Sequence, residues 1–181
     1  MTDLVRRMTA EEYFALPETN HIQELIDGEL IVATPTRAHQ KTLLKAGTYL
    51  TAIAPHGETV IAPSAVRFED QHVFEPDIFW IAPDGDCKPY PYDAGSWIGA
   101  PDLVIEILSP STAKRDRGVK FEVYERHGVR EYWLIDLDSQ FIEVYSHQNG
   151  TFKHQGAYGV EEAFTSPVLG VEVNVKAMFA F

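Results

Sequence analysis

One acidic residue inside an unbroken apolar run constrains the fold of this chain more than any other feature. Residues 101–136, PDLVIEILSPSTAKRDRGVKFEVYERHGVREYWLID, predict a strand, a turn, a helix and a second strand. The first strand, Leu103–Leu108, is apolar except at Glu106, and a continuous apolar run is typical of a strand buried on both faces. An unpartnered carboxylate there would cost several kcal/mol or stay protonated. We therefore expect a cation, a metal or hydrogen-bond donors beside Glu106, and Lys120 in the following helix is one candidate.

The rest of the chain predicts both helices and strands. Thr9 and Glu12 have capping-box spacing, which indicates a short N-terminal helix. Asp27-Gly28 lies between two apolar segments and is typical of a hairpin turn. Residues 82–99 are rich in glycine, proline and aromatic residues and are expected to form a long loop. The other expected helices cover residues 38–53 and 115–127, and the expected strands cover residues 22–26, 29–33, 58–62, 65–69, 74–81, 103–108, 131–136, 141–146 and 151–155, with a last strand in the tail.

Length and composition exclude several classes of protein. The 181 residues are enough for one α/β domain whose core needs no disulfide or structural metal. No apolar run has the length of a signal-peptide core or of a membrane span, roughly 18 residues. Cys87 is the single cysteine, and no group of Cys and His has the spacing of a zinc site. We predict a cytoplasmic protein without a membrane segment.

The charge is unevenly distributed. With 15 basic and 27 acidic residues the net charge is −12, which on average repels nucleic acid. Residues 37–45 nevertheless hold three cations and no acid, and residues 114–130 hold six cations against three acids. If the two segments lie side by side they form a positive face on an acidic protein, although ordinary solvated helix surfaces explain the same pattern. The cations are Arg37, Lys41 and Lys45 in the first segment, and Lys114, Arg115, Arg117, Lys120, Arg126 and Arg130 in the second.

Two further acids lie in apolar surroundings. Asp77 follows Pro76 in FEPDIFWI, and Glu24 lies in IQELIDGEL. Taken singly, each is explained more simply as an edge-strand residue whose carboxylate faces water. Two such acids together with a lysine favour a site for Mg²⁺, which typically takes one or two carboxylates plus water and substrate phosphate. A nearby lysine can position or deprotonate the attacking water, or stabilise charge on the phosphate.

These residues resemble the PD-(D/E)xK nuclease motif, in which an acid on one strand is followed by an acid-x-lysine on the next. Pro76-Asp77 and Glu106-Ile107-Leu108 match it incompletely, because Leu108 stands in the place of the lysine. The wider pattern is similar to the Uma-two family of restriction-endonuclease-like bacterial proteins, in which the lysine lies on the following helix and Lys120 matches it. The resemblance spans nearly the whole chain. Its matching segments are ELIDGEL (24–30), a helix opening with HQ (39–40), PD (76–77), PDLVIEILSPST (101–112), DRGVKFEVY (116–124) and GVREYWLID (128–136).

The resemblance implies a single domain of restriction-endonuclease-like α/β fold, with a mixed central β-sheet flanked by helices. It implies hydrolysis of phosphodiester bonds, with DNA as the expected substrate, and a homodimer. Carried over residue by residue, it assigns Asp77, Glu106 and the backbone carbonyl of Ile107 to a Mg²⁺ or Mn²⁺ ion. Lys120 matches the catalytic lysine, and Glu24 matches an acid that assists the metal or holds the lysine.

Other residues have two interpretations each. Lys114, Arg115 and Arg117 are candidates for contacts with a phosphate backbone, although a solvated helix face explains them equally well. His39 is a candidate for a contact with nucleic acid, whereas an exposed polar position on a helix is the commoner role. Asp116 is expected to cap a helix rather than to pair with Arg115 or Lys120.

Two alternatives to an endonuclease stay open. The first is a catalytically inactive binding or regulatory module of the same fold, which the acidic net charge favours and the retained site residues disfavour. The second is a metal hydrolase for a small phosphorylated or nucleotide substrate, with residues 82–99 as a lid.

Overall fold

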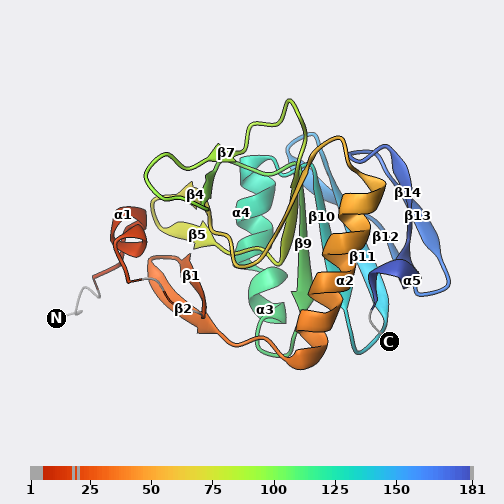
Figure 1. The fold of residues 1–181 in the computed structure, drawn as a ribbon, viewed down its shortest axis with the longest axis horizontal. Helices are drawn as coiled ribbons and strands as arrows, with labels where there is room; N and C mark the ends of the chain where they lie inside the picture. Colours follow the sequence, from red (N-terminus) through yellow and green to blue (C-terminus); the bar gives the residue numbers. More distant parts are fainter. Residues whose placement is uncertain (1–5, 18, 20, 180–181) are drawn as a thin grey trace.

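The predicted strand at residues 103–108 lies within the central sheet of the molecule. A computed structural model describes residues 6–17, 19 and 21–179 (Figure 1). The strand, β9 (Leu103–Leu108), is buried at every position. It runs parallel to β10 (Glu131–Asp136) and antiparallel to β6 (Ile78–Ile81), so the sheet is mixed, as predicted. The strand order is β12-β11-β10-β9-β6-β3, with β3 (Glu58–Ile61), β11 (Phe141–Gln148) and β12 (Thr151–Gly159) as the further strands.

The predicted hairpin forms part of a second sheet. β1 (Ile22–Ile26) and β2 (Glu29–Ala33) pair antiparallel with the predicted bounds. The turn residues Asp27 and Gly28 have φ values of 51° and 72°, the left-handed conformation that a tight hairpin turn of this kind requires. Part of the predicted loop at residues 82–99 forms short paired strands in this sheet. The strand order is β2-β1-β5-β4-β8-β7, with β4 (Val66–Glu69), β5 (His72–Phe74), β7 (Lys88–Pro89) and β8 (Trp97–Ile98) as the further strands.

The strand that the sequence predicts over residues 74–81 is interrupted. The chain leaves β5 at Phe74 and joins the central sheet in β6 at Ile78, so the prediction of one continuous strand is wrong. Pro76 lies between the two strands and has no N–H to donate to a ladder. The interruption falls directly before Asp77, one of the predicted site residues.

The helix that the sequence predicts over residues 115–127 is also divided. It consists of α3 (Ala113–Asp116) and α4 (Val119–His127), so the prediction of one continuous helix is wrong. Gly118 occupies the junction, where a Cβ atom would lie 2.8 Å from a backbone oxygen of α3. The predicted end is confirmed, because Gly128 follows α4 in the left-handed conformation with φ of 81°.

The remaining helices lie at the two ends of the chain and beside the central sheet. Thr9 caps α1 (Ala10–Phe14) with both hydrogen bonds of the predicted capping box. The long helix α2 (Arg37–Ile53) crosses the sheet in Figure 1. Within the described residues, no helix is both long and apolar enough to cross a membrane. The C-terminal part adds a short helix to the predicted strand, and it comprises β13 (Ala163–Ser166), β14 (Val171–Asn174) and α5 (Val175–Met178).

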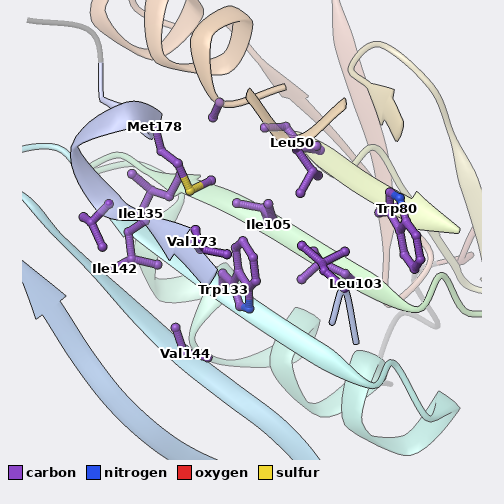
Figure 2. Close-up of a cluster of buried hydrophobic side chains, with 14 of the residues drawn as sticks. Leu50, Trp80, Leu103, Ile105, Trp133, Ile135, Ile142, Val144, Val173 and Met178 are labelled. Atoms are coloured by element: carbon purple, nitrogen blue, oxygen red, sulfur yellow. The ribbon is translucent and has the colours of Figure 1, made fainter. Parts of the chain in front are cut away.

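The side chains of β9 alternate between two apolar layers. The odd-numbered positions face α2 and α5, and Figure 2 shows Leu50 of α2 close to Ile105. The even-numbered positions face α4 and the second sheet, in a cluster that contains Val104 and Leu108. Because alternate residues of a strand share a face, Glu106 is directed into this second layer.

Candidate active site

The two carboxylates predicted to bind a metal lie side by side. Glu106 is 3% exposed and Asp77 is 7% exposed. Ile78 pairs with Ile105 in an antiparallel register, which brings Asp77 opposite Glu106. The Asp77 backbone N–H donates to Glu106 Oε2 at 3.4 Å, and the Ile107 N–H donates to Asp77 Oδ2 at 2.7 Å. The interruption before β6 thus holds the Asp77 side chain against the backbone of the central strand.

Lys120 reaches these acids from the first turn of α4. Its Nζ lies 2.7 Å from Glu106 Oε1, 2.8 Å from Glu24 Oε1 and 3.5 Å from Asp116 Oδ1. The Tyr124 hydroxyl, one turn further along the helix, donates to Glu106 Oε1 at 2.7 Å. Lys120 thus lies within ion-pairing distance of three carboxylates.

Asp116 and Tyr124 are members of this cluster that the sequence did not assign to it. The expected capping role of Asp116 is wrong, because Thr112 and Gly118 occupy the N-cap positions of α3 and α4. The spacing of four residues between Asp116 and Lys120 was the available signal for their pairing. Tyr124 lies at the same spacing beyond Lys120, but an aromatic residue on an amphipathic helix carries no specific signal for a carboxylate contact.

Burial is the largest influence on the ionisation of this cluster. It raises the pKa of Glu106 well above the ordinary value, while Lys120 opposes the rise and neighbouring carboxylates add to it. Burial also raises the pKa of Asp116. Burial opposes the charge of Lys120, but the carboxylates, first of all Glu106, raise the pKa of Lys120 well above the ordinary value. Lys120 is therefore a cation at neutral pH, surrounded by more carboxyl groups than it can neutralise.

His39, on the buried face of α2, contacts Asp77. Its Nε2 lies 3.1 Å from Asp77 Oδ2. Burial opposes the charged imidazole, but the hydrogen bond and charge of Asp77 raise the pKa of His39 overall, with a smaller contribution from the Ile107 backbone. The exposed position that the sequence favours for His39 is wrong. Its helical spacing from the buried Leu43 and Leu50 was the signal for burial, and its contact with nucleic acid stays a prediction.

A pocket of about 200 Å³ opens onto these side chains. The hairpin β1–β2, the segment that precedes α2 and the turn that follows β9 form its walls. In that turn, Ser109 Oγ lies 3.0 Å from Ser111 Oγ and 3.1 Å from Thr112 Oγ1, so hydroxyl groups gather on one wall. Residues 82–99 contribute nothing to the lining, and the structure gives no support to a lid formed by them. The predicted site residues that line the pocket are Glu24, His39, Asp77, Glu106, Ile107 and Lys120.

The cations predicted to contact phosphate lie outside the pocket, on α3 and at its end. Arg117 donates two hydrogen bonds to the Glu143 carboxylate, at 2.6 and 3.1 Å, so a protein acid already neutralises it. Lys114 and Arg115 form no ion pair with any residue that the structure describes. The contact of all three with nucleic acid stays a prediction.

The oxygen atoms facing the pocket suit a hard divalent cation. Asp77 Oδ1 accepts no hydrogen bond from the described residues, and Glu106 Oε2 accepts one long bond of 3.4 Å. Among the residues that the structure describes, no group of three or more His, Cys, Asp or Glu side chains is arranged to hold a metal, so a metal here would have few protein ligands. Mg²⁺ keeps several water ligands and needs one or two carboxylates, and Mn²⁺ has the same preference for oxygen. The residues present therefore fit either ion.

Comparison with known proteins assigns the family. The Uma2 family model, described as "Putative restriction endonuclease", matches residues 10–176. The chain belongs to the Uma2 family. The resemblance that the sequence motifs indicate is thereby confirmed. An uncharacterized protein of Synechocystis, slr1290, is 27% identical to this Uma2 chain over 149 residues, which are 79% of this chain and 75% of the relative.

A crystal structure shows the fold of this Uma2 chain independently. The protein, a "putative nuclease" from Anabaena variabilis, matches with a TM-score of 0.73 at 22% identity. The match covers 95% of this chain and 97% of the other. The restriction-endonuclease-like α/β fold that the sequence predicts is therefore confirmed. The metal, the DNA substrate, the homodimer and the roles of the site residues stay predictions.

Proposed function

We propose that this Uma2 protein is a Mg²⁺- or Mn²⁺-dependent endonuclease that hydrolyses phosphodiester bonds in DNA. The observation that carries the proposal is the meeting of Asp77 and Glu106 in a pocket, with the buried cation of Lys120 at 2.7 Å from Glu106. Carboxylates in excess of cations attract a divalent metal, and the family supports the nuclease class.

The protein groups have separate roles in this proposal. Asp77, Glu106 and the Ile107 carbonyl would hold the metal, which when bound supplies an activated water and offsets negative charge on the phosphate. His39 and the Ile107 N–H orient the Asp77 carboxylate through Oδ2 and leave Oδ1 directed elsewhere. Lys120 stays protonated because its pKa is raised, so it stabilises negative charge and does not accept the proton of the attacking water.

The size of the pocket favours a second candidate, a hydrolase for a small phosphorylated compound. About 200 Å³ is less than the roughly 300 to 1,000 Å³ of usual ligand pockets, and the reactive groups are buried. A compact phosphate ester fits such a space, whereas a DNA strand must direct one phosphate group into it. Both candidates use the same carboxylates and the same lysine.

Calorimetric titration of Mn²⁺ tests the metal site. We expect the wild type to bind Mn²⁺ and the Asp77→Asn and Glu106→Gln variants to lose at least tenfold in affinity, because each removes a carboxylate that faces the pocket. Glu161→Gln is the matched control, since Glu161 is 76% exposed and pairs with Lys176 away from the pocket. Unchanged affinity in both site variants would refute the assignment of the ligands.

Incubation with supercoiled plasmid and with a nucleoside monophosphate separates the activities. Metal-dependent nicking by the wild type and not by Asp77→Asn supports the endonuclease. Release of phosphate from the small compound without nicking supports the second candidate. Metal binding without either reaction points to the inactive binding module of the same fold.

A further inference from the structure

The outer face of α2 differs in charge from the rest of the protein. Arg37, Lys41 and Lys45 are exposed on this helix, and its 17 residues include no acid, although the whole chain has a net charge of −12. None of the three forms an ion pair with a described residue. By contrast, Arg117, which follows α3, and Arg126, in the last turn of α4, pair with glutamates.

The order of charges along α2 does not serve the stability of the helix. The N-terminal end of a helix favours acids and the C-terminal end favours cations, because of the helix dipole. The first turn of α2 has no acid and contains Arg37, and the last turn has no cation. A solvated helix surface is usually stabilised by opposite charges four residues apart, whereas Lys41 and Lys45 repeat the same charge at that spacing. This arrangement is therefore not explained by stabilisation within the helix.

The cationic face starts next in sequence to residues that line the pocket. Thr36, the N-cap of α2, and His39 both line the pocket, and Arg37 lies between them in sequence. With a rise of about 1.5 Å per residue, Arg37, Lys41 and Lys45 follow one another at intervals of about 6 Å along the helix. Leu44 lies among them and is 64% exposed. In Figure 1 the N-terminal end of α2 points toward the same end of the molecule as α3.

We infer that the Arg37–Lys45 face of α2 binds the phosphate backbone of the DNA substrate and leads the strand toward the pocket. The inference rests on the proposed function, because it supplies the acidic protein with a surface that a polyanion can approach. Unpaired exposed cations match a phosphate backbone in charge, and the release of counterions drives such binding. The sequence assigned phosphate contacts to Lys114, Arg115 and Arg117, and Glu143 already neutralises Arg117. Lys114 and Arg115 of α3 also form no ion pair with a described residue, but α2 has three such cations and no acid, so we take α2 as the main contact.

Fluorescence anisotropy with a labelled DNA duplex tests the inference on the full chain, in buffers with EDTA and with Ca²⁺. We expect the Lys41→Gln/Lys45→Gln variant to bind more weakly than the wild type. The slope of log affinity against log salt should be smaller by about 1.8, because each lost phosphate contact removes about 0.9. The matched control is Lys88→Gln/Lys153→Gln, which removes the same charge from exposed positions on β7 and β12 and should keep the wild-type slope.

Three outcomes would overturn the inference. The first is an equal change of slope in the two variants, which would indicate a general effect of net charge. The second is absence of measurable DNA binding by the wild type in either buffer. The third is an unchanged slope together with a change of oligomeric state in sedimentation, which would show that Leu44 and its neighbours contact another protein copy. The Mn²⁺ titrations of Asp77→Asn test the proposed function separately from all three.

Discussion

The buried lysine allows a sharp test of what holds the cluster together. Replacing Lys120 by Met keeps a long apolar side chain and removes the charge. Three carboxylates, on Glu106, Glu24 and Asp116, then lose their common cation. The Lys120 and Glu106 side chains are each 4% exposed, so water cannot replace the lost partner without a change in structure.

The expected loss is large. Removing one partner of a buried ion pair typically costs about 3 to 5 kcal/mol, a substantial share of the 5 to 15 kcal/mol that stabilises a domain. With a urea m-value of about 2 kcal/mol per molar, the midpoint of unfolding should fall by about 2 M. The control is Lys176→Met, because Lys176 and its partner Glu161 are 58% and 76% exposed. That pair should contribute less than about 1 kcal/mol.

The loss should depend on pH in a definite direction. In the wild type the pKa of Lys120 is raised, so its contribution is fully present below the ordinary lysine pKa and disappears only as pH rises through the higher folded value. In the variant, the pKa of Glu106 loses the lowering influence of Lys120 and rises further. Below that pKa the folded variant retains a proton that the unfolded chain releases. The variant therefore recovers stability as pH falls from neutral toward the ordinary carboxyl range.

Urea unfolding followed by circular dichroism at several pH values measures both effects. Adding Glu106→Gln to Lys120→Met should restore part of the stability, because the unpaired buried carboxylate is then absent. A Lys120→Met variant within about 1 kcal/mol of the wild type at neutral pH, with no narrowing of the difference at lower pH, would refute the reasoning.

Two further predictions concern the support of the site and the packing of the core. His39→Ala should lower Mn²⁺ affinity about 10- to 100-fold, because Asp77 Oδ2 loses one of its two hydrogen bonds and keeps only that from the Ile107 N–H. We expect partial rescue in His39→Gln and unchanged circular dichroism. Equal affinities in calorimetry would contradict this role. Gly57→Ala should destabilise the protein by about 1 to 3 kcal/mol, because its Cβ would overlap the Trp80 ring and a backbone oxygen. Gly47→Ala should cost less in thermal unfolding, because its Cβ would overlap one methyl group of Ile61, at 2.6 Å, and no backbone atom or ring.

The sequence predicts an element correctly where the local residue chemistry and the hydrophobic pattern indicate the same structure. The apolar run at residues 103–108, the Asp27-Gly28 turn and the Thr9 capping box each specify an element without help from distant residues, and all three are confirmed. The same holds for the resemblance to the Uma2 family, because the motifs in the central segment are specific. The proximity of Glu24, Asp77, Glu106 and Lys120 follows from those motifs.

The sequence predicts an element boundary or the burial of a residue poorly where tertiary packing determines it. The break at Gly118 depends on the close approach of the α3 backbone, and no pattern in the helix predicts it. Pro76 was visible in the sequence, but the apolar residues on both sides indicated one strand. Asp116 and His39 are polar residue types that usually favour exposed positions. Their burial depends on how α2 and α3 pack against β9. Polar residues at buried positions are where propensity and pattern disagree.

The position of Lys120 among three carboxylates bears on how the folded chain tolerates the absence of metal. In many small metalloproteins the ligands of the metal repel one another when the ion is absent. Such proteins unfold when a chelator removes the metal. Here a side chain of the protein already acts as the counter-ion of Glu106, Glu24 and Asp116. The protein thus has an internal counter-ion for these carboxylates, so the proposed metal site is assembled before any metal binds. If the proposed endonuclease activity is present, a chelator should stop it without unfolding the protein.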